Sequence, residues 1–163
     1  MARTSAIYPT TFKKFFTSDS TSINWKPSGG PDWKAALLLS DYTWAETDDF
    51  LNDISTGEIA NNTSAADLTE VDCGSCTDPA IDTSNNKITF DVDASSITFS
   101  SVAGSQTVRA IVIYRNSGGA SSADELLCYN ILTSDIATAG VDIEVTFDAD
   151  GLFKLTYSDA AYS

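Results

Sequence analysis

The stretch that decides the fold class lies near the C-terminus and reads Val141-Asp142-Ile143-Glu144-Val145-Thr146-Phe147-Asp148. Apolar residues alternate with acidic or polar ones, which is the period of a β-strand that packs one face and leaves the other in water. Residues 87–93 repeat this period, with Ile88, Phe90 and Val92 on one face. Both stretches are therefore predicted to be strands of an antiparallel sheet.

Four more stretches extend the strand pattern. Residues 109–114 and 126–132 are apolar on both faces, and the first of them is predicted to be a central strand. Residues 34–43 are apolar, are bounded by turn residues, and are predicted to form the first core strand. Residues 148–151 end in Asp-Gly, a hairpin signal, so residues 153–157 are predicted to return beside the preceding strand.

One short helix is expected after the first strand. Thr47 can cap it, Phe50, Leu51 and Ile54 share a face, and Gly57 can end it. The chain has no alternation of strands and helices, and about seven to nine short strands favour a sandwich. We therefore expect an all-β fold, an antiparallel β-sandwich with one short helix and an extended N-terminal arm.

The chain has 163 residues, which is enough for one domain. A Pro- and Gly-containing break at residues 27–32 separates an N-terminal arm and linker, residues 1–33, from a β-sandwich domain, residues 34–163. Up to Lys34 there are five positive and two negative side chains, whereas the rest carries four positive and 21 negative ones. The basic arm is expected either to lie along its own acidic domain or to reach a neighbouring subunit.

The arm is rich in aromatic and basic residues, which are common where proteins meet. Trp25, Trp33 and Trp44 belong to the same aromatic region, and they either cover the open end of the sandwich or contribute to a subunit interface. The candidate partner interface consists of Tyr8, Phe12, Lys13, Lys14, Phe15, Phe16 and Trp25.

The composition argues against several classes of protein. The net charge of −14 disfavours a nucleic-acid binder, and the lack of histidine removes the commonest general base and zinc ligand. No enzyme activity and no cofactor are expected. The longest apolar stretch, Ala35 to Leu39, is far shorter than the roughly 20 residues of a membrane span. The first residues lack a signal-peptide pattern, so we expect synthesis in a cytosol and no membrane partner.

Two features have a chemical interpretation as well as a structural one. Cys73 and Cys76 lie in a Gly- and Ser-containing loop, and we expect either free thiols or a local loop disulfide there. Cys128 is predicted to be a small buried residue in a strand. Acidic residues at 91–93 and 148–150 raise calcium as an alternative, but neither segment has the full spacing of a calcium loop, and no metal site is predicted.

The order of these motifs resembles a class of small tailed-bacteriophage virion proteins with a jelly-roll-like β-sandwich. The resemblance covers roughly residues 34–155, and the loop from Cys73 to Cys76 departs from it. It is carried by an aromatic N-terminus followed by stretches of the body, namely residues 12–16, 34–42, 47–54, 88–92, 109–114, 126–129 and 145–155.

This resemblance implies a structural virion component, most plausibly a capsid decoration or cement protein that is often trimeric. Its partner would be the major capsid protein, and its location the capsid surface after synthesis in the bacterial cytoplasm. A tail, neck or fibre component of the same particle is the first alternative. A carbohydrate-binding sandwich that uses Trp25, Trp33 and Trp44 is the second, and an acid-catalysed glycosidase comes last.

Overall fold

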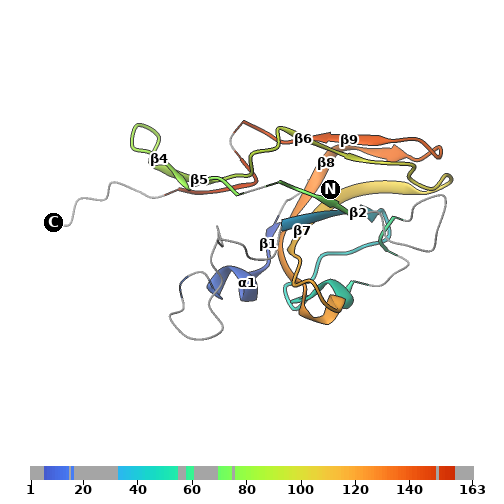
Figure 1. The fold of residues 1–163 in the computed structure, drawn as a ribbon, viewed down its shortest axis with the longest axis horizontal. Helices are drawn as coiled ribbons and strands as arrows, with labels where there is room; N and C mark the ends of the chain where they lie inside the picture. Colours follow the sequence, from blue (N-terminus) through green and yellow to red (C-terminus); the bar gives the residue numbers. More distant parts are fainter. Residues whose placement is uncertain are drawn as a thin grey trace.

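The computed structural model describes residues 6–14, 16, 33–54, 58–60, 70–74, 76–149 and 151–156. Over these residues the fold is all-β, because short antiparallel strands form three sheets, with one short α-helix near the N-terminus (Figure 1). The predicted fold class, an all-β antiparallel sandwich, is confirmed.

The largest sheet has five strands in the order β1–β8–β7–β2–β3, and every neighbouring pair is antiparallel. The central position of β7 matches the prediction for residues 109–114. The strands are β1 (Ala6–Ile7), β8 (Glu125–Ala137), β7 (Thr107–Arg115), β2 (Trp33–Leu39) and β3 (Glu70–Asp72).

A two-stranded sheet of β6 (Ser96–Phe99) and β9 (Ile143–Thr146) packs over one face of the large sheet. Ile143 and Val145 of β9 are buried in this first core, whereas Glu144 and Thr146 are exposed. The alternation predicted from this stretch of sequence is therefore confirmed.

The opposite face of the large sheet carries a second core. Ala36 and Leu38 of β2 and Val112 of β7 lie there, and Leu51 and Ile59 from the segment after β2 pack against them. Because both faces are covered, the middle of each of these strands is apolar on both faces, namely residues 35–39 of β2, 110–114 of β7 and 126–129 of β8.

The helix expected near Thr47 is absent, and a single 3₁₀ turn, η1 (Leu51–Asp53), stands in its place. Phe50 is extended and forms a β-bridge with Glu125, while the N–H of Leu51 donates to the carbonyl of Asp124 at 2.8 Å. Residues 50 and 51 thus pair with the start of β8 and do not form the expected helix. Gly57, its expected end, lies outside the described residues.

The single α-helix of the described residues is α1 (Pro9–Lys14), in the arm. Proline suits the first turn of a helix, and Lys13 and Lys14 lie in the last turn, where positive charge is favourable.

The third sheet consists of β10 (Phe153–Thr156), β5 (Lys87–Phe90) and β4 (Ala80–Asp82), in that order. In Figure 1 it projects to the left beyond the large sheet, and α1 lies below it. We call it the projecting sheet.

The hairpin predicted around residues 148–151 is wrong. The tight turn forms, with the N–H of Gly151 donating to the carbonyl of Asp148 at 2.9 Å, but β9 pairs with β6 and β10 pairs with β5. The N–H of Leu152 donates to the carbonyl of Phe90 at 2.9 Å, so the chain passes from one sheet to another at this turn.

Candidate functional site

Tyr8, a predicted partner anchor, is instead a core residue of its own chain. Its side chain is 0% exposed, and its hydroxyl lies 2.7 Å from that of Tyr42. Tyr42 in turn donates to the carboxylate of Asp48 at 2.9 Å. Burial raises the pKa of both tyrosine hydroxyls, so they remain neutral donors. The interface role of Tyr8 is therefore wrong, because no surface of this side chain is left for a partner.

Lys14 is also engaged within the chain. Its Nζ donates to Glu125 Oε1, and the other oxygen of the same carboxylate accepts a hydrogen bond from Arg115 at 3.2 Å. The Lys14 Nζ also lies 5.6 Å from the ring centroid of Phe50. These contacts hold the end of α1 against the start of β8. In the described part of the arm, residues 6–14 thus lie along the protein's own acidic domain.

Other arm residues keep an exposed surface. Phe16 is 69% exposed, Lys13 is exposed, and Phe12 meets Phe16 edge-on with ring centroids 5.3 Å apart. Phe15 and Trp25, which complete the predicted interface, lie outside the described residues.

The projecting sheet carries a second apolar surface that the sequence did not reveal. Ile81 pairs with Ile88, and Ile88 pairs with Leu155, so the three side chains form one row across the sheet, which we call the apolar row. Ile81 is 69% exposed, and within the described residues none of the three belongs to either core. The row therefore lies on a sheet face that the described residues leave partly open.

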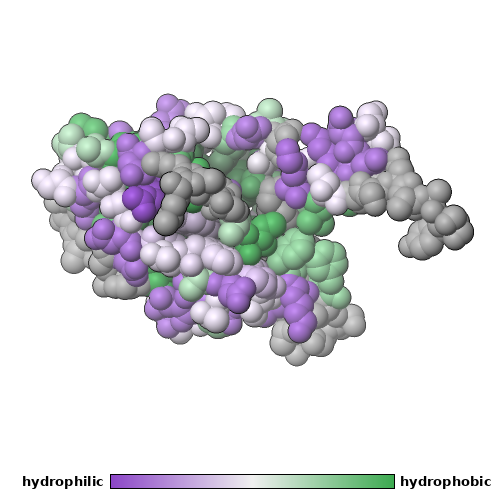
Figure 2. Space-filling view, turned by 180° about the vertical axis from the view of Figure 1, so that it is seen from behind, coloured by the Kyte–Doolittle hydropathy of each residue, from purple (hydrophilic) through white to green (hydrophobic). Residues whose placement is uncertain are grey.

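The surface of the protein is hollowed next to the part that projects (Figure 2). Figure 2, seen from behind, shows a hollow beneath the projecting part, with hydrophobic residues along its walls. Phe90 lies two residues from Ile88 on the same face of β5 and packs against the first core. The apolar face is thus continuous with the core and extends beyond it.

The sequence contains a signal that could have located the projecting sheet. The Asp82 carboxylate accepts hydrogen bonds from the N–H groups of Ser84 and Asn85, and Asn86 has a positive φ of 51°. Asp and Asn in such a cluster mark a tight turn. A hairpin of β4 and β5 follows from this turn, but β4 is too short to show a period of its own.

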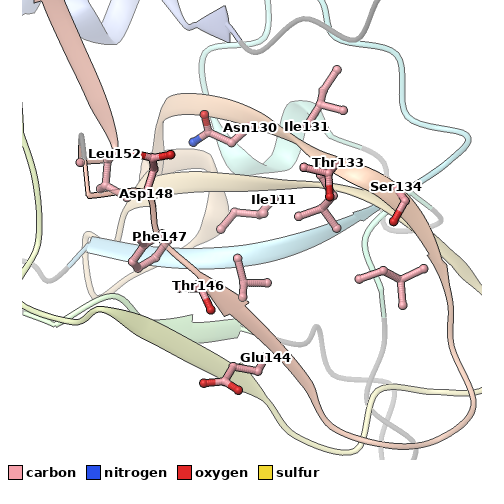
Figure 3. A pocket seen from close by; sticks show the side chains of 14 residues that line it. Ile111, Asn130, Ile131, Thr133, Ser134, Glu144, Thr146, Phe147, Asp148 and Leu152 are labelled. Atoms are coloured by element: carbon pink, nitrogen blue, oxygen red, sulfur yellow. The ribbon is translucent and has the colours of Figure 1, made fainter.

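A groove of about 540 Å³ lies between β8 and β9 (Figure 3). Ile111, Leu132 and Leu152 are among its apolar lining residues. Figure 3 shows Asn130 and Asp148 toward one end of the groove and Thr133 and Ser134 toward the other. An apolar floor with a polar rim suits a peptide segment or a small amphipathic molecule.

The three cysteines are free thiols, so the alternative of a loop disulfide between Cys73 and Cys76 is not realised. All three are buried, and Cys73, Cys76 and Cys128 belong to the first core. Burial raises the pKa of Cys73, and it raises that of Cys128 to about 12. Both thiols are therefore protonated at neutral pH and behave as small apolar residues.

The acidic segments considered for calcium form local contacts. The Asp91 carboxylate accepts the N–H of Val92 at 2.9 Å, and the Asp93 carboxylate lies where a side chain at Gly74 would begin. Over the described residues, no three His, Cys, Asp or Glu side chains are grouped so as to hold a metal ion.

The tryptophans do not form a sugar-binding platform in the described structure. Trp33 is buried in the first core, and Trp44 packs against the second core, 6.3 Å from the ring of Tyr8. Trp25 lies outside the described residues. Nothing in this arrangement favours the carbohydrate-binding alternative.

Comparisons with known proteins give no further guide to function. No protein-family model, curated protein or solved structure matches this chain. Within the described ranges, no helix is long and apolar enough to cross a membrane.

Proposed function

We propose that this protein is a structural component of a tailed-bacteriophage virion, a decoration or cement protein that binds the major capsid protein at the capsid surface. The observation that carries the proposal is the apolar row of Ile81, Ile88 and Leu155 on a sheet that projects away from the core. The order of the sequence motifs, which resembles such virion proteins, supports the same function.

The apolar row has the properties of an attachment surface. An exposed apolar side chain that becomes buried against a partner contributes roughly 1.5–3 kcal/mol. Ile81 is exposed and can contribute most of this, whereas Ile88 and Leu155 are half-buried and contribute less. Exposed Phe16 and Lys13 on the arm offer an aromatic contact with a basic rim. Attachment through these surfaces leaves the two cores intact.

The charge of the chain suits a protein that is present in many copies. A net charge of −14 keeps it soluble before assembly, because like-charged copies repel. Modest affinity per contact is sufficient on a shell, since several contacts of one oligomer act together. Self-association as a homotrimer is part of the proposal and supplies this multivalency.

The first test is the place and copy number of the protein in phage particles. Quantitative mass spectrometry of purified particles should find hundreds of copies per particle if the protein decorates the head. A handful of copies would instead identify a tail, neck or fibre component. Absence from mature particles would refute the virion role altogether.

The second test concerns the attachment surface. Ile81→Asp places a charge in the apolar row and should abolish binding to undecorated heads, while the thermal unfolding temperature stays unchanged. Val141→Asp is the matched control, because Val141 is also exposed, at 58%, in the segment before β9. Equal binding by both variants would show that the apolar row is not the contact.

A further inference from the structure

The groove between β8 and β9 runs along an edge of β9 that pairs with no other strand among the described residues. Five consecutive residues, 144–148, line this side of the groove. Val145 and Phe147 pack into the first core, whereas Glu144 and Thr146 lie on the exposed face. Because residues of both faces line it, the groove follows the edge of the strand. The other edge of β9 pairs with β6.

The backbone groups at this edge are directed into the groove. The N–H of Phe147 donates to the carbonyl of Ser95, which precedes β6, at 3.0 Å. Hydrogen-bonded pairs recur at every second residue of an antiparallel ladder, so Val145 also bonds to the β6 side. The N–H and C=O groups of Glu144 and Thr146 therefore point the other way, toward the groove. Such an edge can accept a further strand.

We propose that this edge of β9 binds an extended segment of a partner protein in which apolar side chains alternate with Lys or Arg. The segment adds to β9 as an antiparallel strand and lies in the groove, which is a recurring mode of peptide recognition. In Figure 3, Glu144 and Thr146 lie along β9, and Thr133 and Ser134 of β8 lie on the other side of the groove. The inference is independent of the virion role.

The apolar half of the partner pattern follows from the floor of the groove. Residues directly opposite each other in an antiparallel pair share a face. A partner residue opposite Val145 therefore points toward the core side, where Ile111 and Leu152 line the groove. An apolar side chain at this position is removed from water on binding.

The basic half of the pattern follows from the charges at the rim. Glu144 and Asp148 line the groove, and its described lining residues include no Lys or Arg. The exposed carboxylate of Glu144 accepts a hydrogen bond from Ser96 at 2.8 Å and has the capacity to accept more. A partner residue opposite Glu144 lies on the same face, so Lys or Arg there meets this carboxylate. A second copy of the chain carries the same net charge of −14 and is repelled.

Amide hydrogen exchange in the presence of a synthetic peptide tests the added strand. The probe is an acetylated and amidated peptide that repeats Lys-Val four times, and the control peptide repeats Glu-Val four times. The Lys-Val peptide should slow exchange at Glu144 and Thr146 about tenfold or more, because their N–H groups become hydrogen-bonded. The Glu-Val peptide should leave exchange unchanged. Unchanged exchange at millimolar Lys-Val peptide, or equal slowing by both peptides, would overturn the proposal.

Methylated peptides test the direction of the new hydrogen bonds without altering the protein. In the added strand the backbone N–H groups of the Lys residues point to β9, and those of the Val residues point away from it. Backbone N-methylation of the Lys residues should therefore abolish the protection of Glu144 and Thr146, whereas N-methylation of the Val residues should retain it. If the peptide methylated at Lys still protects both amides, the strand is not added in this register and the proposal fails.

Substitutions in the protein test the charge match. Glu144→Lys should weaken binding of the Lys-Val peptide about fivefold or more, because an attraction becomes a repulsion. Glu46→Lys is the matched control, since it makes the same change of net charge at an exposed position outside the groove. The exchange titration measures both affinities. Equal affinity of the two variants would show that Glu144 does not contact the basic side chains, which contradicts the proposed specificity.

The protein without peptide distinguishes a partner from other occupants of the edge. In dilute protein the amides of Glu144 and Thr146 should exchange fast, as at an open edge. Slow exchange at every protein concentration would mean that the chain itself covers this edge. Protection that grows with concentration would mean that a second copy covers it. Either result would overturn the assignment to a basic partner segment.

Discussion

The hydroxyl of Tyr8 lies 2.7 Å from the hydroxyl of Tyr42, a residue 34 positions later in the chain. Because Tyr42 donates its proton to Asp48, Tyr8 must donate to Tyr42. This chain of hydrogen bonds joins the N-terminal segment to the second core. The segment is therefore part of the folded domain, and a chain lacking residues 1–30 would lose a core residue.

Substitutions of Tyr8 should separate its hydrogen bond from its packing. Tyr8→Phe removes the hydroxyl and should lower the free energy of unfolding by about 1 kcal/mol. Tyr8→Ala also leaves a cavity in the second core and should cost about 3–5 kcal/mol. Urea denaturation followed by tryptophan fluorescence measures both. A Tyr8→Ala variant as stable as the parent chain would show that the segment does not belong to the fold.

The ion pairs of Glu125 should also stabilise the docked helix. Glu125 is buried and forms ion pairs with both Lys14 and Arg115, so Glu125→Gln removes the negative charge that these two cations share. We expect a loss of about 1–3 kcal/mol in urea denaturation. Glu46→Gln, at an exposed position, makes the same chemical change and should stay within about 0.5 kcal/mol of the parent chain. Equal stability of the two variants would contradict the role of Glu125.

The parts of the fold that the sequence predicted are those in which local pattern and burial agree. Ile143 and Val145 alternate with polar residues and are buried on one face, and residues 109–114 are apolar throughout and form the centre of the large sheet. In both cases the burial of a strand follows directly from the period of its own side chains.

The features that the sequence did not predict depend on partners far along the chain. Phe50 has the spacing of a helical residue but pairs with Glu125, and β10 follows an Asp-Gly turn but pairs with β5. Tyr8 lies in a segment whose aromatic and basic composition is typical of an exposed arm, but its hydroxyl forms a hydrogen bond with that of Tyr42. Local propensity is weaker than these tertiary contacts, so no pattern within each segment could have identified them.

The free thiols predict a specific pattern of reactivity. In the folded protein Cys73, Cys76 and Cys128 are buried, so a thiol reagent such as Ellman's reagent should react slowly. In urea without reductant the reagent should detect all three thiols, because no disulfide is present. Detection of a single thiol in urea would instead indicate a bond between two cysteines.

Alkaline pH should destabilise the fold through these thiols. Burial raises the pKa of Cys73 and Cys128 in the folded state above the ordinary value of about 8.5, whereas the unfolded chain keeps that value. Above about pH 8.5 the unfolded state therefore binds fewer protons than the folded state. The free energy of unfolding should fall by up to about 1.4 kcal/mol per pH unit for each thiol.

Urea denaturation at pH 7, 9 and 10 measures this slope. The raised pKa values of Tyr8 and Tyr42 add to the loss above about pH 10, the ordinary value for tyrosine. Cys73→Ala should lower the free energy of unfolding at pH 7. Between pH 9 and 10, however, that free energy should fall less steeply with pH than in the parent chain, because one buried thiol no longer titrates. A free energy of unfolding that is the same at pH 7 and pH 10 would contradict the burial of these groups.

Gly151 should be essential for passing the chain from β9 to β10. Its φ of +82° is unfavourable for other residues, and a Cβ there would lie 2.7 Å from the carbonyl oxygen of Phe90 and 2.6 Å from the side chain of Thr89. Gly118 has a similar φ of +75° but no atom within 4 Å of the equivalent position. Comparing the same substitution at the two glycines therefore separates the cost of backbone strain from the cost of steric overlap.

Gly118→Ala should cost about 1–2 kcal/mol, the penalty of a left-handed backbone alone. Gly151→Ala should cost clearly more, because the overlap with the Phe90 carbonyl also pushes β10 away from β5. Urea denaturation gives both values, and amide exchange at Ile88 and Leu155 should accelerate only in Gly151→Ala. Since these two residues form most of the apolar row, the same variant should weaken attachment to phage heads. Equal costs for the two substitutions would show that the turn relaxes without disturbing the projecting sheet.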